Sequence, residues 1–235
     1  MANIFTSSIG KKLIMSISGL FLILFMFIHA FVNALSLISD EAFDAGCEFM
    51  ALPIVTVMVP VLAAGFIIHI VYAFILNFMN LKARGPQRYA VANKAKTDDW
   101  ASKNMLVLGI IVLGVLAFHL THFWAKMQLP EMMGGHPEVG SVLMKETFKP
   151  LWVVIVYIVW FAALWLHINH GFWSALHTLG LNNNIWMKRW KVVSLVISTV
   201  LVVAAIKPYT HFNGEQFVFR EIISPGKGSP SKCWQ

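Results

Sequence analysis

Histidine is the residue type whose placement in this chain points most directly to chemistry. Uncharged hydrophobic stretches enclose His29, His69, the pair His119 and His122, and the pair His167 and His170. An imidazole in hydrocarbon needs a partner, because an unsatisfied polar group there costs several kcal/mol. A hydrogen bond to a neighbouring helix would satisfy one such histidine. Histidines in four successive stretches instead indicate metal ligands, and neutral imidazole is an ordinary axial ligand of haem iron.

The composition places these histidines in a membrane protein. The chain has 235 residues, 58% of them hydrophobic and 12% charged, and its mean hydropathy is +0.70. These values exclude an ordinary soluble domain. Five stretches are long enough for a membrane-spanning helix, which needs about 20 residues, although the fifth is at the lower limit. We therefore predict an all-α, polytopic membrane protein, a five-transmembrane-helix bundle enclosing two b haems.

The predicted helices cover residues 10–38, 52–82, 101–128, 148–178 and 187–207. They make up a transmembrane domain at residues 1–207, which a polar tail follows at residues 208–235. The connection at residues 128–149 contains Gly134, Gly135 and Pro137, so an irregular loop is predicted there.

Basic residues predict how the helices are oriented. Most of the Lys and Arg residues fall on the side that carries the N-terminus, the connection at residues 82–103 and the start of the fifth helix. The first connection, on the opposite side, is acidic. The positive-inside rule then predicts a cytoplasmic N-terminus and an external C-terminus. The net charge of +7 follows from this topology and does not indicate nucleic-acid binding. For the connection at residues 82–103, anionic lipid and a soluble partner are equally good ligands.

The depth of each histidine predicts how they pair. At 1.5 Å per residue, His29 and His119 lie roughly 25 Å from the cytoplasmic edge, whereas His69 and His167 lie roughly 20 and 17 Å from it. The first and third helices therefore offer imidazoles at an outer level, and the second and fourth at an inner level. Two stacked haems, each held by two histidines, require this arrangement.

Two glycines share the faces of these histidines. Gly19 and Gly109 precede His29 and His119 by ten residues, which is close to three helical turns. A glycine there would leave room for a porphyrin at the other level. Ordinary helix packing through small residues is the alternative.

The two cysteines, Cys47 and Cys233, belong to no CxxC or CxxCH motif. Covalent haem attachment and iron–sulfur ligation by this chain are therefore not expected. A disulfide between them would require that both face an oxidising compartment.

Four segments of the first four predicted helices resemble one family: IHAFVN, IIHIVYAF, GIIVLGVLAFHLTHFW and LHINHGFW. The family is the di-haem cytochrome b membrane anchor of succinate:quinone oxidoreductases, in its single-subunit, five-helix form. The resemblance covers residues 8–206. It implies that each of these helices supplies a haem ligand: His29 and a third-helix histidine for the outer haem, His69 and His167 for the inner haem.

The third helix offers two candidate ligands. The spacing from Gly109 favours His119, whereas the aromatic residue that follows the ligand in some relatives favours His122; we choose His119. His122 is the alternative ligand. If His119 is the ligand, we expect His122, like His170 and His177, to contact the haem propionates or the far side of a ligand ring.

The resemblance also implies a function. The chain would have no succinate chemistry of its own and would be the anchor of a succinate dehydrogenase or fumarate reductase in the bacterial inner membrane. Flavoprotein and iron–sulfur subunits would dock on the cytoplasmic face, and electrons would pass through two b haems to or from a membrane quinone, most often menaquinone. The resemblance leaves open whether the complex is a dimer.

One position departs from the family. Some menaquinol-oxidising relatives have a glutamate two residues before the fourth-helix ligand, where this chain has Trp165, which puts their proton pathway in doubt here. Glu48 is the acidic residue nearest the expected outer quinone region, and a solvated loop position is its alternative interpretation.

Two other functions remain open. The chain could be the di-haem cytochrome b of a hydrogenase or formate dehydrogenase, which neighbouring genes would reveal. It could also be a haem-free transporter that uses histidines for protons, and a visible spectrum would separate that case.

Overall fold

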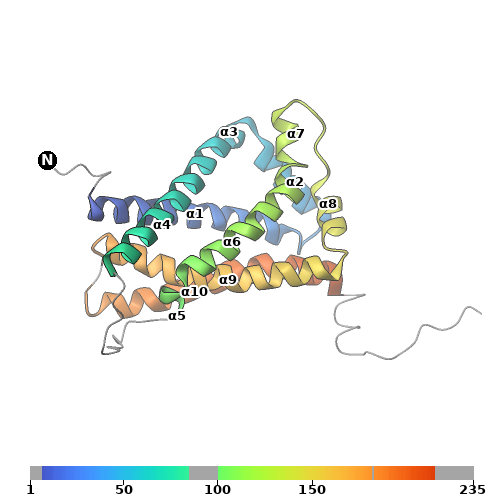
Figure 1. Ribbon diagram of the computed structural model, residues 1–235. Coiled ribbons are helices and arrows are strands. Elements are labelled where there is room, and N and C mark those ends of the chain that lie inside the picture. The colour runs from blue at the N-terminus through green and yellow to red at the C-terminus, as the bar shows by residue number, and fades with distance from the viewer. Residues whose placement is uncertain (1–6, 85–99, 182, 215–235) are drawn as a thin grey trace, which may run out of the picture.

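The computed structural model describes residues 7–84, 100–181 and 183–214, and its regular structure in these ranges is helical, without strands. Five helical segments are long and apolar enough to cross a membrane. They are α1 (Ser8–Leu35), α4 (Met58–Arg84), α6 (Met105–His119) with the π-helical turn η1 (Leu120–Trp124), α9 (Leu151–Thr178) and α10 (Trp186–Gly214) (Figure 1). The prediction of an all-α chain with five membrane-length helices is confirmed.

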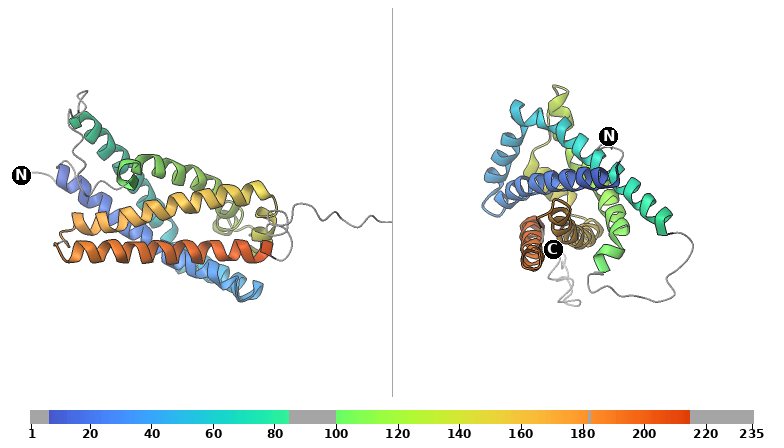
Figure 2. Two further views of the ribbon diagram at one scale, coloured as in Figure 1. Left: turned by 90° about the horizontal axis from the view of Figure 1, so that it is seen from below. Right: turned by 90° about the vertical axis from the view of Figure 1, so that its left-hand side faces the viewer.

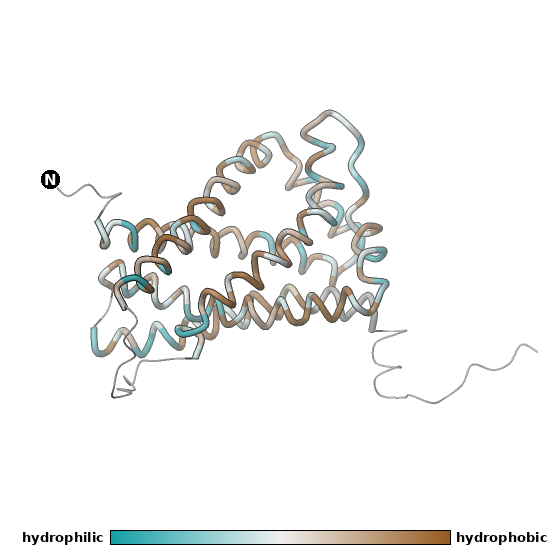
Figure 3. Tube along the Cα trace, viewed as in Figure 1, coloured by the Kyte–Doolittle hydropathy of each residue, from teal (hydrophilic) through white to brown (hydrophobic). Residues whose placement is uncertain are grey.

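These helices form where the sequence lacks charge, because a helix satisfies its backbone groups internally. Figure 3 shows apolar residues along α4 and α6, and polar residues near the helix ends and between α7 and α8. Side chains cap two of the helices. The Ser7 hydroxyl accepts a hydrogen bond from the Gly10 amide at the start of α1, and the side-chain oxygen Oδ1 of Asn183 accepts one from the Trp186 amide at the start of α10. Such caps satisfy amides that the first turn leaves unpaired.

The connections contain short helices: α2 (Asp40–Ala51), α3 (Pro53–Thr56), α5 (Trp100–Lys103), α7 (Gln128–Met132) and α8 (Gly140–Thr147). The prediction of an irregular loop at residues 128–149 is therefore wrong where α7 and α8 form, but it is confirmed for residues 133–139, which contain Gly134, Gly135 and Pro137. Gly134, with a φ of 73°, allows the chain to turn after α7. The helix α8 forms because Leu143, Met144 and Thr147 lie on one side of it and are buried. The last helix, α10, ends at Gly214, beyond the predicted end at 207.

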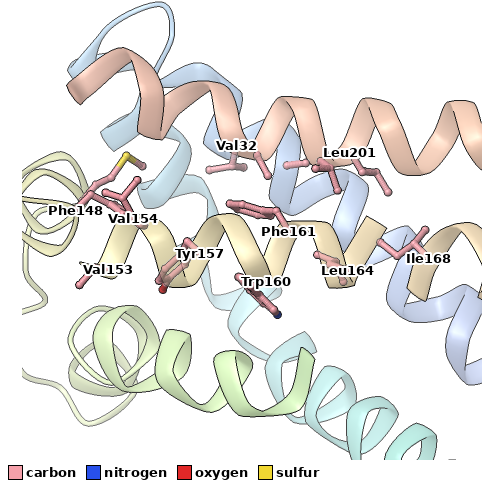
Figure 4. Packing of buried hydrophobic residues seen from close by; sticks show 14 of the residues in the cluster. Val32, Phe148, Val153, Val154, Tyr157, Trp160, Phe161, Leu164, Ile168 and Leu201 are labelled. Carbon is pink, nitrogen blue, oxygen red and sulfur yellow. The ribbon is translucent and has the colours of Figure 1, made fainter. Parts of the chain in front are cut away.

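The helix α9 lies at the centre of the bundle and packs against α1, α6 and α10. Figure 2 shows α9 and α10 side by side. Aromatic and aliphatic side chains of α9 form the main core with α1 and α10, and Figure 4 shows Phe161 on the side of α9 that faces Leu201 of α10. The helix α4 packs mainly against α1, and none of its hydrophobic side chains is buried. Such exposure suits a helix that faces lipid.

The two ends of the bundle differ in charge. The start of α1 and the end of α10 lie at opposite ends of the bundle (Figures 1 and 2). The first end is basic, with Lys11, Lys12, Lys82, Lys103, Lys188, Arg189 and Lys191. The opposite end carries α2 and α8, which an ion pair between Lys145 and Asp40 joins. The predicted basic connection at residues 82–103 falls largely outside the described residues.

Candidate functional site

The structure brings the four predicted ligands together as two pairs. The ring centroids of His29 on α1 and His119 on α6 lie 5.8 Å apart, with the ring planes at 89°. Those of His69 on α4 and His167 on α9 lie 6.3 Å apart, at 70°. We call these the outer pair and the inner pair, and both match the partners that helix depth predicts.

The separation within each pair fits two imidazoles on opposite sides of one metal ion. Imidazole nitrogens bind a metal such as zinc at about 2 Å, so two rings on one ion have centroids about 6 Å apart. In the described part of the chain, no group of three or more His, Cys, Asp and Glu side chains gathers as a metal site. A structural zinc ion needs four ligands, whereas haem iron brings its own equatorial nitrogens and needs only axial partners. The paired histidines therefore fit haem better than a bare ion.

Each pair bridges two helices that have little direct contact. The close helix neighbours are α1 with α4 and α9, and α6 with α9, whereas α1 with α6 and α4 with α9 touch little in the described residues. The imidazoles of a pair thus reach toward each other across the interior from opposite sides of the bundle. The two helices that carry a pair are already apart, so a flat group could lie between the two imidazoles.

The glycines that accompany the histidines lie at the inner pair. A Cβ at Gly19 on α1 would lie 3.1 Å from Cε1 of His69, and a Cβ at Gly109 on α6 would lie 3.7 Å from Cε1 of His167. Each glycine is ten residues from the outer-pair histidine of its own helix, which is about 15 Å along the axis. The two pairs therefore lie at two depths, as predicted.

The two candidates in the third helix have different partners. His119 faces His29, and its Nδ1 lies 3.3 Å from the Tyr157 hydroxyl. His122 turns back on its own helix, where its Nδ1 lies 2.9 Å from the carbonyl oxygen of Phe118. The π-helical turn η1 begins directly after His119, and such turns often occur at functional sites. The geometry favours the choice of His119.

Three further predicted site residues belong to neither pair. The His170 ring packs on Trp173, with the ring centroids 4.8 Å apart. His177 is exposed in the last turn of α9, and Glu48 is exposed on α2. No described contact joins His177 or Glu48 to either pair, so their predicted roles rest on the sequence alone.

Side chains that the sequence analysis did not single out complete the surroundings of the pairs. Ser18 Oγ lies 3.3 Å from Nδ1 of His69. Trp160 lies beside His119, and its indole N–H donates to the carbonyl oxygen of Val112 on α6. Figure 4 shows Tyr157 and Trp160 on the side of α9 that faces α6. The sequence signal for Ser18 was weak, because Ser16 lies two residues before it in the same apolar stretch.

The helices α2 and α8 pack together beyond the outer pair. Both oxygens of the Asp44 carboxylate accept hydrogen bonds from Ser141, one from the amide at 2.8 Å and one from the hydroxyl at 2.7 Å. Gly140 permits this close packing, since a Cβ there would lie 2.8 Å from Sγ of Cys47. Burial, together with the Asp44 and Glu48 carboxylates, raises the pKa of the Cys47 thiol to about 12. Cys47 is free, and Cys233 lies outside the described residues.

No family model matches the chain, and no curated protein or solved structure matches it either. The fold and the site therefore define the class by themselves. The chain is a helical protein with five membrane-length helices and two facing pairs of histidines at two depths.

Proposed function

We propose that the chain is the membrane-anchor cytochrome b subunit of a succinate dehydrogenase or fumarate reductase complex. The observation that carries the proposal is the presence of two facing histidine pairs inside a bundle of membrane-length helices. The ring centroids lie 5.8 Å apart in the outer pair and 6.3 Å apart in the inner pair. The resemblance of the four histidine segments to that family directs the proposal to succinate and fumarate chemistry in a partner subunit.

The residues of the chain would hold and orient two b haems. His29 and His119 would bind one iron, and His69 and His167 the other. A b haem supplies one-electron transfer when it is bound. The helices would keep the two pairs at fixed depths, and the apolar surroundings would exclude water from them. Ligand identity and burial are the means by which a protein adjusts haem potentials.

The charge of the two ends supports a direction for partner docking. The basic end lies on the cytoplasmic side by the positive-inside rule, and the inner pair is the one closer to it. A cytoplasmic iron–sulfur subunit would therefore meet the inner pair first. A membrane quinone would react near the other end, close to the outer pair.

The experiment is a haem assay on the purified protein combined with its visible spectrum. We expect two b haems per chain, both six-coordinate and low-spin. No haem, or one haem per chain, would overturn the proposal. Co-purification with flavoprotein and iron–sulfur subunits would support the succinate assignment, whereas hydrogenase or formate dehydrogenase subunits would contradict it.

A further inference from the structure

One imidazole in each pair has a hydroxyl group at its Nδ1 atom. Ser18 of α1 lies 3.3 Å from Nδ1 of His69 in the inner pair. Tyr157 of α9 lies 3.3 Å from Nδ1 of His119 in the outer pair. Both hydroxyl residues are buried. In each case the hydroxyl comes from a third helix, which carries neither histidine of that pair.

The proton positions at Ser18 follow from its second contact. Its hydroxyl donates to the carbonyl oxygen of Met15, 3.1 Å away, and a serine hydroxyl has only one proton. The Ser18 oxygen must then accept from Nδ1 of His69, so this nitrogen carries the ring proton. In a neutral imidazole the other nitrogen, Nε2, then has the free lone pair that a metal needs.

The Tyr157 hydroxyl lies as far from Nδ1 of His119 as Ser18 Oγ lies from Nδ1 of His69. Tyr157 is 1% exposed, and it lies ten residues before His167 on α9. The helix α9 therefore supplies a ligand at the inner level and a hydroxyl at the outer level. The helix α1 does the reverse, with Ser18 at the inner level and His29 at the outer level.

We infer that Ser18 and Tyr157 are positioning residues: their hydroxyl oxygens accept hydrogen bonds from Nδ1–H of His69 and His119 and so leave Nε2 of each ring free to bind iron. The inference rests on the proposed function. A metal-bound histidine whose second nitrogen donates a hydrogen bond is fixed in orientation and is a stronger electron donor to the metal. Each hydroxyl therefore stabilises the oxidised form of its own haem and lowers the reduction potential of that haem alone.

The test is a redox titration of both haems in Ser18→Ala and Tyr157→Phe. In Ser18→Ala we expect the inner haem to favour the reduced form by up to about tenfold, a rise of 59 mV for a one-electron couple, while the outer haem stays unchanged. Tyr157→Phe should give the reverse pattern. Ser18→Thr keeps the hydroxyl and should restore the wild-type potential. Complete loss of the inner haem in Ser18→Ala, with recovery in Ser18→Thr, supports the same role.

Two matched variants control for packing. Ser16→Ala removes a buried hydroxyl from the same helix, and Tyr72→Phe removes a phenol hydroxyl from α4; neither should move a potential. The inference fails if Ser18→Ala and Tyr157→Phe keep both haems at wild-type potentials, or if Ser16→Ala gives the same shift as Ser18→Ala. A wild-type protein without haem would instead overturn the proposed function, and this inference with it.

Discussion

The inner and outer pairs have similar separations but different surroundings. Small groups surround the inner pair: Gly19 and Gly109 each lie close to one of its rings, and Ser18 supplies the hydrogen bond. Large aromatic groups surround His119 of the outer pair, where Tyr157 and Trp160 of α9 lie beside its ring. One ligand arrangement can thus be supported either by close helix approach or by aromatic packing. The two supports should fail in different ways when they are mutated.

The largest expected effect separates the two candidates in the third helix. His119→Ala should remove the outer haem, because His119 faces His29. His122→Ala should keep both haems, because that ring bonds to the carbonyl oxygen of its own helix at Phe118. Haem content and difference spectra check this. Loss of a haem in His122→Ala with both retained in His119→Ala would show that the wrong ligand was chosen.

The next prediction concerns the close approach at the inner pair. Gly19→Ala places a Cβ 3.1 Å from the His69 ring, and such overpacking costs about 1–3 kcal/mol. Binding of the inner haem should weaken by that amount, while the outer haem is kept. Gly114→Ala is the control, since its Cβ would meet nothing within 4 Å. Equal haem occupancy in the two variants would mean that the glycine is not needed for ring approach.

A smaller effect is expected at the end beyond the outer pair. Asp44→Ala removes the acceptor of two hydrogen bonds from Ser141, and a hydrogen bond to a charged group is worth about 1.5–3 kcal/mol. Thermal unfolding in detergent should show this loss of stability. Ser141→Ala should add little in the double variant, because both changes break one contact. Glu48→Gln, on the exposed side of α2, is the control and should leave stability unchanged. If the losses of stability in Asp44→Ala and Ser141→Ala were fully additive in the double variant, the contact between these residues would be contradicted.

The reactivity of Cys47 gives the mildest test of the same region. With a thiol pKa of about 12, only about one molecule in 10⁴ carries the thiolate at pH 8, and the thiolate is the reactive form. Alkylation in a Cys233→Ser background should be slow and should accelerate about tenfold per pH unit. Asp44→Asn should speed it, because that carboxylate helps to raise the pKa. A rate at pH 8 equal to that of a free cysteine would contradict the raised pKa.

The sequence predicted the long helices well because uncharged runs of membrane length have one stable backbone solution. It also predicted the partners within each pair, because depth follows from counting residues along a helix. It did not reveal α7, or α8, whose formation depends on burial of Leu143 and Met144 against the rest of the fold. Ser18 and Tyr157 were missed for a similar reason. Their contacts join different helices, and no spacing along one helix indicates them.

The central claim is that two histidine pairs at two depths each hold one haem. The most direct measurement is a redox titration that identifies which haem remains after each of three single substitutions. His69→Ala and His167→Ala should lose the same haem, and His29→Ala should lose the other one. Loss of the same haem in His69→Ala and His29→Ala would contradict the account.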